Sequence, residues 1–205
     1  MMSAYVQQLA PSSYMGNCAA FQTADQLRRV QRVAYRTKQL ALAHPARGFG
    51  QSERTIWEKR EPWQAIRKAV EGLLVCYDWD DAFVGLNLVV KPVSDEIFLK
   101  IFGGIARENG AELDALINDN MYLDAERSRR WTAAMCKFVA KGNATNGTVL
   151  RERLAKWVPT AKIIAEAGGR LLAAYGKRSK PAEIEAAVSA GWSRVLEQVG
   201  LKDDA

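Results

Sequence analysis

Apolar residues recur along the chain at intervals of three and four, the spacing that gathers them on one side of an α-helix. The clearest case lies near the C-terminus, where successive apolar positions are separated by four, four, three and four residues: Ile184, Val188, Trp192, Val195 and Val199. No segment of useful length alternates apolar and polar residues as a half-buried strand would. The pattern therefore predicts an all-α fold.

A second apolar stripe predicts a long amphipathic helix. Thr23 and Gln26 form a capping-box pattern, so we expect the helix to begin there and to end before Pro45. Its apolar positions predict a buried face: Leu27, Val30, Val33, Ala34, Leu40 and Ala41.

Proline, glycine and capping residues divide the remaining sequence into further helices. Pro62 suits a first helical turn, and Pro92 is the next strong breaker, so one helix is expected between them. Within it, the segment 77–90 is apolar around most of its circumference, and we expect part of this surface to remain exposed as a groove. The other expected helices are 1–8, 94–109, 113–117, 123–141, 148–175 with a kink at Pro159, and 181–199, with a linker at 177–180.

Length and composition favour one main core. The chain has 205 residues, of which 48% are hydrophobic, and we predict a partial helical bundle over residues 1–142 followed by a C-terminal helical extension over residues 143–205. No apolar run is long enough to span a membrane, and the first residues lack the pattern of a secretory signal, so a cytoplasmic location is predicted. Three widely spaced cysteines are expected to be reduced and packed.

The net charge of +6 raises nucleic acid as a partner. Basic residues alternate with acidic ones, for example Lys59 and Arg60 between Glu58 and Glu61, which is more typical of a solvated helix surface. A basic helical nucleic-acid-binding or scaffold protein is therefore kept as the alternative function.

Acidic residues open an apolar helix at Asp78, Asp80 and Asp81, as they do in helical bundles that bind metal through carboxylates. A di-iron site of that kind also takes a Glu-x-x-His pair from each of two helices. The chain has one histidine, His44, without a glutamate three residues before it. Neither a metal site nor a catalytic site is therefore predicted in this chain.

Three segments, 27–37, 77–92 and 124–131, together resemble the beta subunit of the hydroxylase in bacterial multicomponent di-iron monooxygenases of the toluene and phenol hydroxylase type. The resemblance implies a ferritin-like helical bundle that packs on a catalytic alpha subunit, which would hold the di-iron centre. It also implies a small gamma subunit, a regulatory effector protein and a reductase as partners. Beta subunits of this family extend upstream of Met1, so we expect the bundle to be incomplete at its N-terminus.

The resemblance also implies positions for a lost metal site. The Glu-x-Arg-His motif of the alpha subunit corresponds to residues 26–29, from Gln26 to Arg29, and to residues 127–130, from Arg127 to Arg130, so arginine replaces both histidines. Asp81 falls near the place of a metal-binding glutamate. We expect several of Arg29, Arg130, Asp81 and Glu126 to form a buried ion-pair network, because unpaired charges inside a bundle are unfavourable.

The tryptophans divide by their expected surroundings. Trp63, Trp79 and Trp131 are predicted in the core, while Trp57 and Trp157 are candidates for an interface with a partner.

Overall fold

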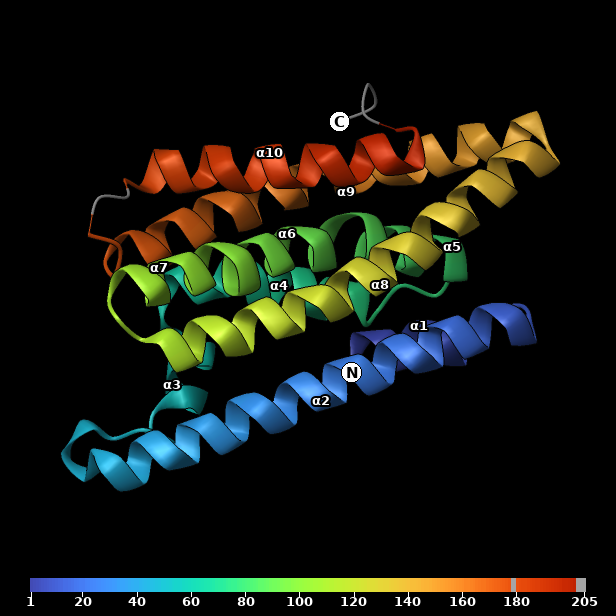
Figure 1. The fold of residues 1–205 in the computed structure, drawn as a ribbon. Coiled ribbons are helices and arrows are strands. Elements are labelled where there is room, and N and C mark those ends of the chain that lie inside the picture. The colour runs from blue at the N-terminus through green and yellow to red at the C-terminus, as the bar shows by residue number, and fades with distance from the viewer. Residues whose placement is uncertain (178–179, 202–205) are drawn as a thin grey trace.

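In a computed structural model that describes residues 1–177 and 180–201, every regular element is helical, which confirms the all-α prediction (Figure 1). The N-terminal part consists of α1 (Met2–Gln8), α2 (Ser13–Ala43), the short turn η1 (Pro45–Arg47), α3 (Glu53–Lys59) and α4 (Glu61–Leu73). The middle consists of α5 (Trp79–Val84), η2 (Gly85–Val90), α6 (Lys91–Asp95), η3 (Glu96–Ile101) and α7 (Phe102–Glu108). The C-terminal part consists of α8 (Glu112–Gly142), α9 (Ala144–Ala173) and α10 (Pro181–Val199).

The five middle elements follow one another without interruption and form one central helix from Trp79 to Glu108, in which η2 and η3 are π-helical. The predicted break at Pro92 and the predicted start of a new helix at residue 94 are therefore wrong. Pro92 has no N–H to donate to the Leu88 carbonyl one turn earlier, but the indole N–H of Trp192 in α10 donates to that carbonyl at 2.7 Å. The preceding π-helical turns also change the hydrogen-bond register beside the proline ring, so the helix continues.

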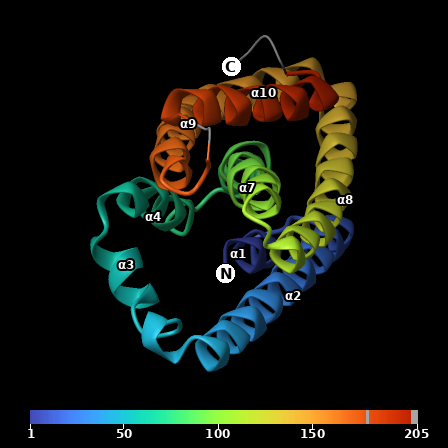
Figure 2. The same ribbon diagram turned by 60° about the vertical axis from the view of Figure 1, so that its left-hand side comes forward.

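Other helices surround the central helix. Figure 2 shows its α7 end enclosed by α4, α8, α9 and α10, and every residue from Ala82 to Val93 is buried. The expectation that part of the segment 77–90 remains exposed is wrong over residues 82–90, each of which is buried, although Leu86 and Val90 do line an open groove beside α2. A helix that is apolar on all sides is typical of such a central position.

The C-terminal helices belong to the same core. Leu154, Trp157 and Ile164 of α9, together with Val188 of α10, share one hydrophobic cluster with residues of the central helix. The apolar stripe predicted for α10 is buried, as expected. The packing therefore does not divide at residue 142, where a C-terminal extension was predicted to begin. The predicted linker 177–180 includes Arg178 and Ser179, which lie outside the described residues.

Two helices, α8 and α9, are longer than predicted. α8 runs unbroken over the expected gap between residues 117 and 123, and α9 continues through Pro159. The Asn143 side chain accepts a hydrogen bond from the Thr145 backbone N–H at 3.0 Å, which caps the start of α9. In the described part of the chain, no helix has an apolar stretch sufficient to cross a membrane.

The helix predicted from Thr23 begins ten residues earlier, at Ser13, where Ser12 is the N-cap. Thr23 lies inside α2, and its hydroxyl donates to the Ala19 carbonyl at 2.8 Å, so it does not cap the helix. The stripe predicted to be buried is largely exposed: Leu27, Val30 and Val33 have exposed fractions of 61%, 63% and 51%.

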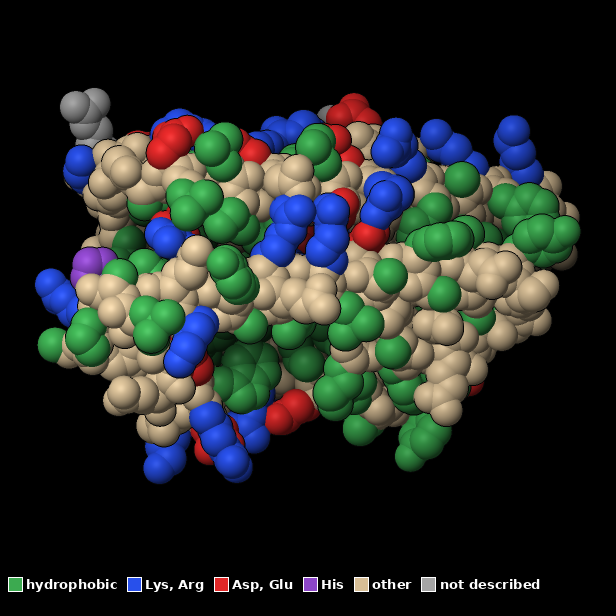
Figure 3. Space-filling view, turned by 60° about the horizontal axis from the view of Figure 1, so that its bottom comes forward, with side chains coloured by type: hydrophobic (Ala, Val, Ile, Leu, Met, Phe, Trp, Pro, Cys, Tyr) green, Lys and Arg blue, Asp and Glu red, His purple; other side chains and the backbone are tan. Residues whose placement is uncertain are grey.

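Polar contacts hold α2 against α8. Three arginines of α2, four residues apart, reach α8, and one arginine of α8 reaches back; the pairs are Arg28–Asp124, Arg32–Asn120, Arg36–Asp114 and Arg127–Asp25. We call these four pairs the polar ladder. Figure 3, which views the molecule from the α2 side, shows a group of basic and acidic side chains near the middle of the view. The apolar stripe of α2 points elsewhere, which explains why it is not covered.

Candidate functional site

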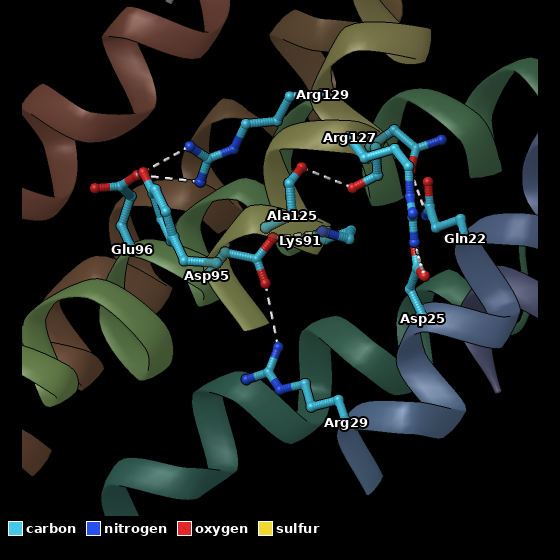
Figure 4. A network of polar contacts seen from close by, with 12 residues as sticks. Gln22, Asp25, Arg29, Lys91, Asp95, Glu96, Ala125, Arg127 and Arg129 are labelled. Carbon is cyan, nitrogen blue, oxygen red and sulfur yellow. Dashed lines mark hydrogen bonds and ion pairs between the residues drawn. The ribbon is translucent and has the colours of Figure 1, made fainter. Parts of the chain in front are cut away.

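Two consecutive carboxylates lie inside the bundle on the central helix. Asp95 and Glu96, at the junction of α6 and η3, have exposed fractions of 1% and 2%. Consecutive residues of a helix point about 100° apart, so the two carboxylates meet different neighbours (Figure 4). Burying two negative charges is unfavourable unless each is paired, and each of them is.

Asp95 is paired with two cations. The Lys91 ammonium, one turn earlier on the same helix, donates to it at 2.5 Å, and the Arg29 guanidinium of α2 donates at 3.1 Å. Burial lowers the pKa of Lys91, and the charge of Asp95 opposes this shift.

Glu96 is held from the other side by α8. It accepts hydrogen bonds from the Tyr122 hydroxyl at 2.7 Å and from Arg129 at 3.1 Å. Arg129 also donates to the Tyr122 oxygen at 2.7 Å, and its guanidinium lies 4.8 Å from the centre of the tyrosine ring. Burial, together with the bond to Glu96, raises the pKa of Tyr122 to about 12. We call Arg29, Lys91, Asp95, Glu96, Tyr122 and Arg129 the buried charge network.

A glycine of α10 completes this arrangement. Gly191 packs directly on the Glu96 side chain, and a Cβ at this position would overlap the carboxylate. The buried charge network therefore contacts α2, α8 and α10 from the central helix.

A second buried polar cluster centres on Gln22 of α2. Its amide nitrogen donates to Asn87 at 2.7 Å and to Ser3 at 3.3 Å, and its oxygen accepts from the Trp131 indole at 3.0 Å. The Asn87 amide nitrogen has no hydrogen-bond partner among the described residues. These amide and hydroxyl groups connect α1, α2, the central helix and α8, and they contain no carboxylate, thiol or imidazole.

The predicted ion-pair network forms with other members. Arg29 does reach a buried carboxylate, but that carboxylate is Asp95 and not Asp81. Arg130 and Glu126 are exposed, so their predicted place in a buried network is wrong. The inward face of α8 includes Ala125, and Arg129, one turn later, lies on that face, whereas Arg130 is rotated away from it.

Asp81 forms a separate pair. It is buried and accepts hydrogen bonds from Lys156 at 2.5 Å and from the Trp157 indole at 2.8 Å. Burial alone would raise the pKa of Asp81, but these two donors hold it below its usual value. Trp157 is only 7% exposed and lies in the core, so its predicted interface role is wrong.

The remaining predicted residues take peripheral positions. Gln26 is half-buried beside Arg29, and Arg127 is exposed and pairs with Asp25 in the polar ladder. Trp57 is half-buried with its ring centre 6.0 Å from that of Trp63; its interface role remains a prediction. The tryptophans expected in the core are partly buried and pack against it: Trp63, Trp79 and Trp131.

The cysteines have free thiols. Cys76 and Cys136 are buried and Cys18 is half-buried, in line with the predicted packed thiols. Burial raises the pKa of Cys136 to about 12, so its thiol is a poor nucleophile.

The donor set does not fit a di-iron centre. Within residues 1–177 and 180–201, no three or more His, Cys, Asp or Glu side chains lie close enough to hold a metal ion. His44, the single histidine of the chain, is exposed at the C-terminal end of α2, and Asp95 and Glu96 are already neutralised by lysine and arginine. Arginine cannot lose its proton to become a ligand. No step of metal chemistry is therefore assigned to these residues.

Sequence reasoning missed most members of the buried charge network. A usable signal was present: Lys91 and Asp95 are four residues apart, and Glu96 follows, within a segment that is otherwise mostly apolar. Charges inside such a segment are expected to pair with one another or with a neighbouring helix. The partners on α8, Tyr122 and Arg129, could not be read from that spacing.

Comparison with known proteins shows the family. The chain is 45% identical over 167 residues to the beta subunit of the hydroxylase component of the toluene-4-monooxygenase system of Ectopseudomonas mendocina, covering 82% of this chain and 51% of that protein. It is 26% identical over 158 residues to the small subunit of the hydroxylase component of propane 2-monooxygenase from Mycolicibacterium smegmatis (strain ATCC 700084 / mc(2)155), covering 75% and 43%. The chain spans about half the length of these curated relatives.

A solved structure of toluene 4-monooxygenase with toluene bound in the resting active site superposes with a TM-score of 0.81 and 44% identity, over 84% of this chain and 57% of that one. This match supports the predicted ferritin-like bundle. The alternative prediction of nucleic-acid binding has no support in these comparisons. The sequence profile of the methane/phenol/alkene hydroxylase family matches residues 1–143, and the chain belongs to that family.

Proposed function

We propose that this chain is a non-catalytic, beta-type subunit of a multicomponent monooxygenase hydroxylase. Its role would be to brace a catalytic alpha subunit and to supply contacts for the assembled hydroxylase. Oxidation of an aromatic or alkene substrate would take place in the alpha subunit, which we expect to hold the di-iron centre.

The observation that carries the proposal is the state of the two buried carboxylates. In a metal-binding bundle, inward carboxylates are left free to bind the ions. Here Asp95 and Glu96 are instead paired with lysine and arginine side chains from three helices. Together with the membership of a hydroxylase family, this supports a structural subunit.

Further partners are also proposals. By the family resemblance we expect a small gamma subunit, a regulatory effector protein and a reductase to reach this chain through the assembled hydroxylase. A cytoplasmic location stays a prediction.

Iron analysis and co-purification test the proposal together. The chain would be expressed with a tagged candidate alpha subunit that carries two Glu-x-Arg-His motifs, and the product would be examined by size-exclusion chromatography and iron analysis. We expect a stable complex, iron in proportion to the alpha subunit, and no stoichiometric iron in the purified chain alone after incubation with ferrous ions. Two tightly bound irons per chain would overturn the non-catalytic assignment, and failure to form a complex would overturn the subunit role.

A further inference from the structure

An open groove runs along the exposed apolar stripe of α2. Its first part has a volume of about 480 Å³ and lies between α2 and the central helix; Val30 and Val33 form one wall, and Leu86 and Val90 lie on the other. Figure 3 shows a hollow beside α2 with apolar side chains inside it. More than half of each of the two α2 valines is exposed there.

A second part of the groove, of about 730 Å³, continues from the first. Both parts are lined by Arg29 and Val33, so the two are adjacent. Apolar and aromatic side chains of α4, η3, α7, α8 and α9 dominate its lining: Trp63, Phe98, Leu99, Phe102, Met121, Leu171 and Leu172. An exposed apolar groove of this extent is typical of a binding surface.

The charges at the groove are mostly positive. The described residues that line the two parts include four cations, Arg29, Lys91, Arg60 and Arg170, and one anion, Asp95. Arg29 and Lys91 share that anion, and Arg170 pairs with carboxylates outside the groove. Arg60 has no ion-pair partner among the described residues. The groove therefore complements a ligand that is apolar and carries negative charge.

The walls also restrict the shape of the ligand. They are formed by helices, whose backbone groups are already bonded to one another. An extended peptide in an apolar groove without a strand edge would leave its own N–H and C=O groups unpaired, whereas an α-helix satisfies them internally.

We propose that the groove binds one amphipathic α-helix of another polypeptide, with its apolar face against Val30 and Val33 and a carboxylate directed toward Arg60. The charges disfavour a second copy of this chain, because its own groove face would bring a second set of mostly positive lining residues to a groove that is already positive. This inference is independent of the proposed enzymatic assembly, since it concerns only the chemistry of the helix that fits.

A binding assay on the purified chain tests the charge and shape requirements. The probe is a fluorescein-labelled peptide of about 20 residues, built from Leu, Ala and Glu so that one helical face is apolar and glutamates flank it. Two matched peptides replace every Glu by Lys or scramble the order to destroy the apolar face. By fluorescence anisotropy, we expect saturable binding of the acidic helix, binding about tenfold weaker for the lysine version, and none for the scrambled version.

Variants of the chain locate the site. Val33→Glu lies where the two parts of the groove meet and should weaken binding of the acidic peptide about tenfold. Leu42→Glu, also exposed on α2 but outside the groove lining, is the matched control and should leave binding unchanged. Arg60→Glu should weaken the acidic peptide and strengthen the lysine peptide, an exchange that misfolding cannot produce.

Several results would overturn the inference. These are equal binding of the acidic and basic peptides, or no effect of Val33→Glu and Arg60→Glu. Concentration-dependent dimerisation that Val33→Glu abolishes, without peptide binding, would assign the groove to a second copy. Binding to phosphatidylglycerol vesicles, without peptide binding, would assign it to a lipid surface.

Discussion

Replacing Arg129 by methionine would test the buried charge network most directly. The Arg129 side chain is 11% exposed and donates to both Glu96 and Tyr122. Methionine keeps much of the apolar length of arginine but removes the charge and the donors. Glu96, which is 2% exposed, would then remain buried with a weaker set of partners.

The size of the effect follows from the remaining contacts. Removing one partner of a buried ion pair destabilises a protein by about 3–5 kcal/mol, because the other charge is left uncompensated. Lys100 at 3.4 Å, and Arg194 at 4.0 Å, still lie near Glu96 and reduce that penalty. We therefore expect a loss of about 3 kcal/mol in the free energy of unfolding, at the lower end of that range.

Urea unfolding, followed by circular dichroism, would measure this loss. With a urea dependence of about 2–3 kcal/mol per molar, the midpoint should fall by about 1 M. Arg130→Met, one residue later and exposed, is the matched control and should change the free energy of unfolding by less than about 0.5 kcal/mol. Adding Glu96→Gln to Arg129→Met should restore part of the loss, since the uncompensated charge is then gone. Equal midpoints for the two arginine variants would refute the reasoning.

Three further measurements test contacts of the buried charge network and of the polar ladder. Gly191→Ala should destabilise the chain by about 1–3 kcal/mol in urea unfolding, because its methyl group overlaps a buried carboxylate; Gly104→Ala, where the added methyl group meets nothing, should not destabilise it. The pKa of Tyr122 is raised to about 12 in the folded chain, so its contribution to the free energy of unfolding should be fully present below pH 10 and should be lost from about pH 10 to 12. The free energy of unfolding of the Tyr122→Phe variant should fall less over that range. A double-mutant cycle on Arg36 and Asp114, joined by contacts of 2.6 and 2.8 Å, should give a coupling of about 1 kcal/mol at low salt that shrinks in 1 M NaCl; a coupling independent of salt would contradict the electrostatic account.

Predictions from the sequence are most accurate for a helix whose position is determined by a single apolar face. The stripe of α10 is buried along its whole length. Its apolar residues lie on one face and its polar residues on the opposite face, so only the apolar face can pack against α9 and the central helix. The ends of α7 and α8, at Glu108 and Gly142, lie within one residue of the ends predicted at residues 109 and 141. Family resemblance supplied the ferritin-like bundle, which periodicity alone does not specify.

Tertiary contacts decided the points that local rules predicted wrongly. The sequence predicts a helix end at Pro92, but Pro92 lies inside a helix whose Leu88 carbonyl accepts a hydrogen bond from Trp192, a residue a hundred positions further along the chain. The motif correspondence predicts an inward Arg130, whereas the direction of each side chain depends on where α8 meets the central helix, and there Arg129 points inward. Neither fact is contained in the neighbouring sequence.

The stripe of α2 shows a different limit. The spacing of Leu27, Val30 and Val33 correctly indicates an apolar helix face, but periodicity does not say what covers that face. In α2 the polar ladder to α8 uses a different face, the one that carries Arg28, Arg32 and Arg36. Their spacing of four residues was visible in the sequence as a second, cationic stripe.

The buried charge network explains how two acidic residues are accommodated in the centre of the bundle. Asp95 and Glu96 point to different neighbours, so one fixes α2 through Arg29 while the other fixes α8 through Arg129. Apolar residues of similar volume can stabilise a core equally well, so stability alone does not account for the charges. A misaligned α2 or α8 would leave a buried carboxylate unpaired, and that penalty would disfavour alternative registers. The network therefore sets the positions of α2 and α8 relative to the central helix.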